Sequence, residues 1–134
     1  GLNTYIFKTS KKNNTIIFHN SSNHIKIKIL KRKGITLIKS KLNIKKNFDL
    51  KIILKRLFSL GIRNLLVEGG DMITKNMLKK RLINQFYLLK STKNLPKTKK
   101  YVIFTSNNIL TKNYKIISTI SSKLAKDKIT IYKR

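Results

Sequence analysis

The sequence predicts a single α/β domain over residues 1–134, with a mixed, mostly parallel sheet flanked by helices. Three observations indicate this class. Hydrophobic residues make up 40% of the chain, which is enough for a core. Short β-branched runs alternate with segments of helical periodicity. The stretch LLVEGGDMITKNML (65–78) passes from an apolar run through a glycine pair into a helix-like pattern, which is the order of elements in a βαβ unit.

The first forty residues predict two short strands around a segment of undecided structure. TIIF (15–18) is β-branched and aromatic, and the turn-like HNSSN follows it. Residues 25–33, IKIKILKRK, fit either a half-exposed strand or a short helix, and Gly34 breaks the segment. ITLIK (35–39) then predicts the second strand.

The stretch FDLKIILKRLFSLG (48–61) is the clearest helix of the chain. Asp49 is suited to the N-cap, where its carboxylate accepts early amide hydrogens. Gly61 suits the left-handed position past the helix end. Apolar residues recur at i, i+3, i+4 and i+7 and form one stripe: Leu50, Ile53, Leu54 and Leu57.

The second half predicts further alternation of strands and helices. LLV (65–67) is expected to be a buried strand covered on both faces, followed by a helix over 72–81. QFYLLK (85–90) predicts the next strand, KNLPKTKK a loop and YVIFTS (101–106) another strand. Two β-rich runs, 115–120 and 128–132, predict a closing antiparallel hairpin.

The chain is strongly basic, with 32 Lys and Arg against 4 Asp and Glu and a formal net charge of +28. This raises the alternative of a small basic nucleic-acid-binding protein, because clustered cations release counterions from phosphate backbones. The lysines are spread along the chain, however, and 27 Lys, 21 Ile and 14 Asn stand against one Ala. Lys, Asn and Ile share A/T-rich codons, so genome composition explains the bias without a nucleic-acid partner.

Several classes are excluded or disfavoured by what the sequence lacks. It has no cysteine, so disulfides and thiolate metal sites are excluded. No apolar run reaches the roughly 18 residues of a membrane span, and the N-terminus has no signal-peptide pattern. His19 and His24 lie in a polar stretch without a nearby acid, which favours solvated residues over a metal site. We expect a cytoplasmic protein with no metal.

The Glu-Gly-Gly turn is the candidate functional site. Ligands of open α/β sheets collect outside the carboxyl ends of the strands, and Gly69 and Gly70 allow close backbone approach. The helix that begins near Asp71 would present free amides to an anion such as a phosphate. The G-x-G-x-x-G and P-loop patterns are absent, so a purely structural glycine turn remains the alternative.

The two acids beside the glycines have different interpretations. An acid in the first helical turn is stabilised by the helix dipole, and because it would repel a phosphate we expect the Asp71 side chain to face away from one. Glu68 would end a buried strand, where a carboxylate is partly desolvated and takes a partner. That partner is either a structural lysine or the amino or hydroxyl groups of a ligand.

The segment LGIRNLLVEGGDMITKNMLKKRLINQFYLLKS (60–91) resembles the reductase domain of the bifunctional riboflavin-biosynthesis deaminase/reductase, the RibD family, which has a dihydrofolate-reductase-like fold. The likeness is closest over residues 48–91, around the strand that ends in Val-Glu-Gly-Gly. It extends loosely from TYIFKTS to ISTISSKLAKDKITIYKR, which resembles the closing hairpin of that domain.

The resemblance implies a reduction of 5-amino-6-(5-phosphoribosylamino)uracil by NADPH, in which hydride delivery to C1′ opens the ribose to the ribityl chain. It implies that Glu68 contacts this small-molecule substrate. The turn and the first helical turn would hold the dinucleotide phosphates, through Gly69, Gly70, Asp71, Met72, Ile73, Thr74, Lys75 and Asn76. The family often has proline where this chain has Asp71. A homodimer is left open.

The resemblance also defines what is missing. The deaminase domain of the family carries a His-x-Glu and Cys-x-x-Cys zinc site, and neither motif occurs here, so that activity is excluded for this chain. The resemblance implies that the front part of the reductase domain is missing, and the sequence does not begin with Met, so we expect an incomplete domain from a longer protein. A catalytically incomplete reductase fragment is therefore a further alternative.

Overall fold

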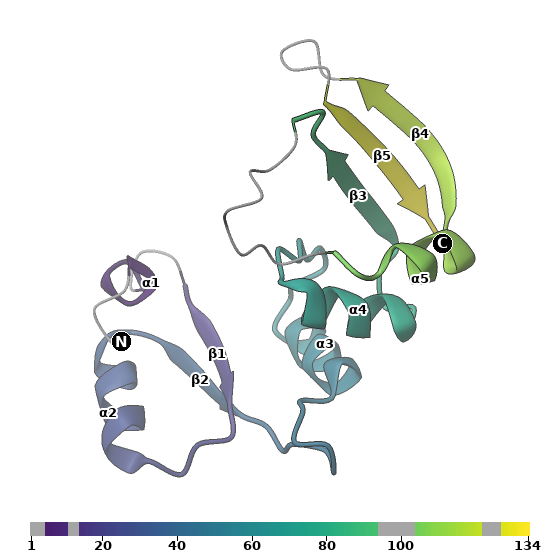
Figure 1. Cartoon of the computed structure of the whole chain (residues 1–134). Coiled ribbons are helices and arrows are strands. Elements are labelled where there is room, and N and C mark those ends of the chain that lie inside the picture. The colour runs from purple at the N-terminus through teal and green to yellow at the C-terminus, as the bar shows by residue number, and fades with distance from the viewer. Residues whose placement is uncertain (1–4, 11–13, 94–103, 122–126) are drawn as a thin grey trace. The chain divides into compact units, whose positions relative to one another are not determined.

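The structure is a computed structural model that describes residues 5–10, 14–93, 104–121 and 127–134. The chain divides into two compact units, Gly1–Arg63 and Asn64–Arg134, and each is described by itself (Figure 1). The predicted α/β class is confirmed, because one unit holds a parallel strand pair and the other an antiparallel sheet. No helix within the described ranges is long and apolar enough to cross a membrane.

The first unit is built around a parallel pair of strands. Its elements are α1 (Tyr5–Lys8), β1 (Ile16–His19), α2 (His24–Arg32), β2 (Thr36–Lys39) and α3 (Leu50–Ser59). Parallel neighbours need a crossover connection, and α2 supplies it between β1 and β2. The undecided segment 25–33 is therefore mainly helical, and Asn23 caps it by accepting the Lys26 amide hydrogen at 2.9 Å.

Helix α3 follows the prediction closely. The Asp49 carboxylate accepts the Lys51 amide hydrogen at 2.9 Å, and Gly61 adopts a φ of 87° just past the helix. The four residues of the predicted apolar stripe are all half-buried, whereas the cations Lys51, Lys55 and Arg56 are exposed. The cap, the stripe and the terminal glycine are confirmed together.

The second unit carries a three-stranded antiparallel sheet and two helices. Its elements are α4 (Asp71–Lys79), β3 (Gln85–Lys90), α5 (Asn107–Asn113), β4 (Lys115–Ser121) and β5 (Lys128–Lys133). The strand order is β3-β5-β4, so the predicted closing pair, β4 with β5, is confirmed, with one irregularity between Ile116 and Ser118. The core joins helices to sheet: Leu78 of α4, Leu110 of α5, Tyr114 and Tyr132.

Two predictions for this unit are corrected. Residues 65–67 form no strand, and Leu65 and Leu66 are 48% and 79% exposed. Their apolar character indicated burial, but burial of a strand requires a neighbouring ladder, and this segment pairs with no described strand. Of the strand predicted at 101–106, residues 101–103 lie outside the described residues, and 104–106 lead into α5 rather than forming a strand.

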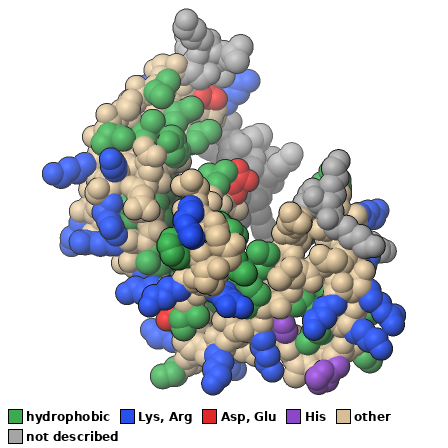
Figure 2. Space-filling view, turned by 180° about the vertical axis from the view of Figure 1, so that it is seen from behind, with side chains coloured by type: hydrophobic (Ala, Val, Ile, Leu, Met, Phe, Trp, Pro, Cys, Tyr) green, Lys and Arg blue, Asp and Glu red, His purple; other side chains and the backbone are tan. Residues whose placement is uncertain are grey.

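The basic side chains on the face that Figure 2 draws do not form a single patch. Figure 2 shows Lys and Arg side chains scattered over the face in view, with apolar groups between them. This scatter agrees with the even distribution of lysines along the sequence.

Candidate functional site

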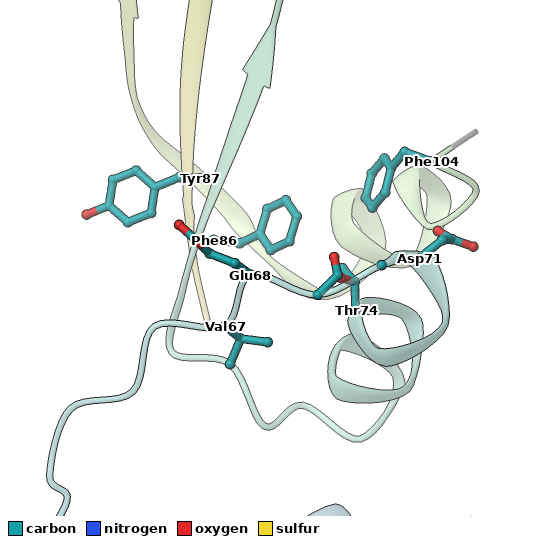
Figure 3. A pocket seen from close by; sticks show the side chains of 9 residues that line it. Val67, Glu68, Asp71, Thr74, Phe86, Tyr87 and Phe104 are labelled. Atoms are coloured by element: carbon teal, nitrogen blue, oxygen red, sulfur yellow. The ribbon is translucent and has the colours of Figure 1, made fainter. Parts of the chain in front are cut away.

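A pocket of about 360 Å³ opens at the Glu-Gly-Gly turn of the second unit (Figure 3). The turn and the start of α4 form one part of its wall, and β3 and the segment before α5 form the rest. Its lining residues are Val67, Glu68, Gly69, Gly70, Asp71, Thr74, Phe86, Tyr87 and Phe104. Small-molecule sites commonly measure roughly 300–1,000 Å³, so the pocket has room for part of a ligand.

Helix α4 begins at this turn with unsatisfied amides. Gly70 is its N-cap and offers no side chain to accept their hydrogens. The first backbone bond runs from the Thr74 amide to the Gly70 carbonyl at 3.2 Å. In the part of the chain that the structure describes, the amides of Asp71, Met72 and Ile73 have no acceptor. Such amides, at the positive end of a helix dipole, are suited to binding an anion.

The two glycines of the turn differ in the space around them. A Cβ added to Gly70 would meet no atom within 4 Å, whereas a Cβ added to Gly69 would overlap Cγ2 of Ile73. Gly69 is thus required for packing against α4. Gly70 leaves open space beside the free amides, and this is where a ligand can approach the backbone.

Glu68 differs from the other three acids of the chain. Each of Asp49, Asp71 and Asp127 accepts a backbone amide hydrogen, from Lys51, Thr105 and Thr92. Glu68 is exposed, which corrects the expectation that it is partly desolvated at a strand end. Among the described residues it has neither a hydrogen-bond donor nor a cation as partner. Of the two partners considered for Glu68, a structural lysine is not found among the described residues, and the carboxylate is available at the pocket.

Asp71 is held by the segment that precedes α5. Its carboxylate accepts hydrogen bonds from the Thr105 amide at 3.0 Å and the Thr105 hydroxyl at 2.7 Å, and it lies 3.4 Å from the Ser106 hydroxyl. The hydroxyl and then the amide of Thr105 lower the pKa of this carboxyl below its ordinary value. Figure 3 shows the Glu68 and Asp71 carboxylates pointing away from each other. The charge of Asp71 is thus directed towards α5 rather than across the pocket.

The remaining predicted site residues are only partly brought together. Thr74 is buried, lines the pocket and donates its hydroxyl hydrogen to the Gly69 carbonyl at 3.5 Å. The side chains of Met72, Ile73, Lys75 and Asn76 are not part of the pocket lining, and Met72 is 74% exposed. Ile73 packs against Gly69, and the ammonium of Lys75 contributes to the lowered pKa of Asp71.

Sequence reasoning missed the aromatic wall of the pocket. Phe86 and Phe104 stack with ring centroids 6.0 Å apart and an interplanar angle of 20°, and Tyr87 lines the same space. Phe86 and Tyr87 lie on the predicted strand 85–90, but nothing in the sequence connects that strand to the turn. The only local signal was the aromatic pair within an alternating strand.

Solved structures resemble this fold. The Acinetobacter baumannii RibD structure (form 2) has a TM-score of 0.70 and 15% identity, covering 99% of this chain and 34% of that one. A pyrimidine reductase-like protein from Corynebacterium diphtheriae has a TM-score of 0.64 and 18% identity, covering 88% and 48%. At these identities the likeness shows the fold, and this chain spans about a third and about half of those two chains.

No curated protein matches the sequence. The family model of the RibD C-terminal domain matches residues 2–126, which is most of the chain and includes the Glu-Gly-Gly turn, α4 and β3. The resemblance predicted from the turn is confirmed by this match. The chain belongs to the RibD C-terminal domain family.

Proposed function

We propose that this chain contributes to the NADPH-dependent reduction of 5-amino-6-(5-phosphoribosylamino)uracil in riboflavin biosynthesis, within a cytoplasmic oxidoreductase. Family membership supports the reaction class. The observation that carries the assignment is the placement of Glu68, the acid without a partner among the described residues, in a pocket beside Gly70 and the free amides of α4.

The residues of the turn fit a dinucleotide phosphate. The amides of Asp71, Met72 and Ile73 would donate to its oxygens, and the space over Gly70 would allow the approach. The buried Thr74 lies at the same turn and supports the Gly69 carbonyl. NADPH bound there would supply the hydride, while the chain binds and orients the reactants.

Glu68 would orient the substrate. An exposed carboxylate accepts hydrogen bonds from amino and hydroxyl groups, and charge-assisted bonds of this kind are stronger than neutral ones. The stacked rings of Phe86 and Phe104 give the pocket an apolar wall, which suits a planar heterocycle. The turn thus offers amides that would bind a phosphate and a carboxylate that would accept hydrogen bonds from amino or hydroxyl groups. Cofactor and substrate would therefore be bound at the same turn.

A titration with NADPH tests the proposal directly. The fluorescence of the reduced nicotinamide follows the binding. We expect saturable binding, one NADPH per chain, which survives moderate salt. A control titration with single-stranded RNA measures the nucleic-acid alternative, whose affinity would fall steeply with salt. Tight, salt-sensitive RNA binding without saturable NADPH binding would overturn the proposed function.

A further inference from the structure

Asp71 makes a long-range contact that the proposed reaction does not require. It is the first residue of α4, yet its carboxylate bonds to Thr105 and Ser106, 34 and 35 residues further along the chain. The Thr105 hydroxyl at 2.7 Å and the Thr105 amide at 3.0 Å lie closer to the Asp71 carboxylate than the Ser106 hydroxyl at 3.4 Å. The contact joins the start of α4 to the residues that precede α5.

The segment held by Asp71 carries part of the pocket wall. Phe104 directly precedes Thr105 and stacks on Phe86 across the pocket lining. Ser106, which follows Thr105, is fully buried and is the N-cap of α5. Its hydroxyl makes no capping bond to α5 and lies within reach of Asp71 instead. The bonds from Asp71 therefore act on the residues next to Phe104, whose ring also packs against the core.

We propose that Asp71 is a positioning residue that fastens the 104–106 segment to the Gly69-Gly70 turn and so fixes Phe104 in the pocket wall. Its second effect follows from its charge, since a carboxylate in the first turn of α4 reduces the positive potential of the free amides. Positioning and charge thus act in opposite directions on an anion bound at α4. The consequence for NADPH rests on the proposed function, whereas the fastening itself does not.

Acid should weaken the hold on the segment, because a protonated carboxyl still accepts a hydrogen bond but without the assistance of its charge. The charged group that acts on Asp71 among the described residues is Lys75 of α4, and the groups facing it from the α5 side are the hydroxyls of Thr105 and Ser106. The folded-state pKa of Asp71 lies below the ordinary carboxyl value. The charge-assisted part of the contact is therefore fully present above the ordinary value and is lost as the pH falls through the lowered one.

A tryptophan at position 104 in the pocket wall would show, without any ligand, whether Asp71 holds the 104–106 segment in place. Phe104→Trp gives the chain its sole tryptophan, and its emission and acrylamide quenching are measured in four forms. These are the single variant alone and the same variant combined with Asp71→Asn, Asp71→Ala or Asp127→Ala. Asp127 is the matched control, because it also accepts one backbone amide hydrogen, from Thr92 at 3.2 Å, and does not line the pocket.

We expect Asp71→Ala to shift the tryptophan emission of the Phe104→Trp chain to longer wavelength and to increase its quenching. Asp71→Asn keeps an acceptor for the Thr105 amide but loses the charge, so it should change both signals less than Asp71→Ala does, and Asp127→Ala should leave both signals unchanged. An unchanged emission in Asp71→Ala, or an equal shift in Asp127→Ala, would overturn the proposal. If Asp71→Ala does not fold, an acid titration of Phe104→Trp decides: its emission must shift before the far-ultraviolet circular dichroism is lost, and coincident loss overturns the proposal.

NADPH titrations of the same variants separate the two effects of Asp71. Asp71→Asn keeps most of the positioning and removes the charge, so it should bind NADPH more tightly than Asp71→Ala, which loses both. Equal affinities of these two variants would contradict a positioning role. If no variant binds NADPH, the proposed function fails, while the emission measurements still decide whether Asp71 holds the wall.

Discussion

Gly69 and Gly70 are adjacent residues with opposite tolerance for a side chain. Gly69→Ala places a methyl group against Ile73, whose β-branched side chain has little χ1 freedom in a helix. We expect it to lower the free energy of unfolding by roughly 1–3 kcal/mol. Gly70→Ala meets open space at a φ of −68°, but alanine is a poorer N-cap than glycine, so it should cost about 1 kcal/mol or less. Urea denaturation followed by circular dichroism measures both.

The Gly69 and Gly70 variants also separate an effect on packing from an effect on ligand binding. The space over Gly70 is open among the described residues, and a methyl group there would obstruct a ligand at the α4 amides, so Gly70→Ala should weaken NADPH binding about tenfold or more, or by at least about 1.4 kcal/mol. Adding Ile73→Ala to Gly69→Ala removes the overlapping atom and should recover much of the lost stability. An equal loss of stability in both glycine variants, or unaltered NADPH affinity in Gly70→Ala, contradicts this account of the turn.

Glu68→Gln tests the substrate contact with almost no change in shape. The carboxylate has no partner among the described residues, so the free energy of unfolding should be unchanged. Loss of a charge-assisted hydrogen bond costs about 1.5–3 kcal/mol, so we expect substrate KM to rise roughly 10- to 100-fold and the Kd for NADPH to stay constant. Steady-state kinetics and the NADPH titration measure the two constants. Loss of cofactor affinity with substrate affinity intact would refute the assignment of Glu68.

The elements that build the pocket depend on one small core. Leu78 of α4 and Leu110 of α5 are fully buried and pack with Tyr114 and Tyr132. We expect Leu110→Ala to lower the free energy of unfolding by about 2–5 kcal/mol, because it removes buried methyl groups and leaves a cavity. Ile120→Ala on β4, where the side chain is 51% exposed, is the matched control and should cost less than about 1 kcal/mol. Similar losses in urea denaturation would show that the core is not where the structure places it.

Elements with local signals were predicted well, and elements defined by distant partners were not. Asp49, the apolar stripe and Gly61 specify α3 within its own residues, and the glycine pair specifies the start of α4. The segment 65–67 has the composition of a strand but no ladder partner in the described residues. Helix α5 begins with two asparagines, which are weak helix formers, and its position depends on burial of Leu110.

The residues of the candidate site divide in the same way, into those with a local sequence signal and those defined by distant partners. Glu68, Gly70 and the free amides of α4 lie within one short stretch, so the turn was visible in the sequence. Phe86 and Phe104 join the pocket only through folding, because β3 and the start of α5 are brought to the turn by the core. The bond from Asp71 to Thr105 spans 34 residues, and no local pattern predicts a contact of that length.

At the scale of the whole molecule, the formal net charge of +28 influences every anion that approaches the chain. Long-range attraction of this kind is screened as the Debye length shortens from about 30 Å at 0.01 M to about 10 Å at 0.1 M salt. NADPH is itself an anion, so part of its affinity will be unspecific attraction to scattered lysines. Weak binding at low salt would therefore not demonstrate a site.

The salt dependence of Gly70→Ala distinguishes a site from unspecific attraction. Alanine removes no charge, so plots of log Kd against log salt should be parallel for the variant and the unaltered chain. The specific contribution of the turn to NADPH affinity should appear as a constant vertical separation between the two plots. Inorganic tripolyphosphate serves as a competitor that binds by charge alone, and the separation should persist at salt concentrations where it no longer displaces NADPH. If the two plots instead converge at high salt, the affinity arises from the net charge alone. The Glu-Gly-Gly turn would then have a purely structural role, which is the alternative that the sequence also allowed.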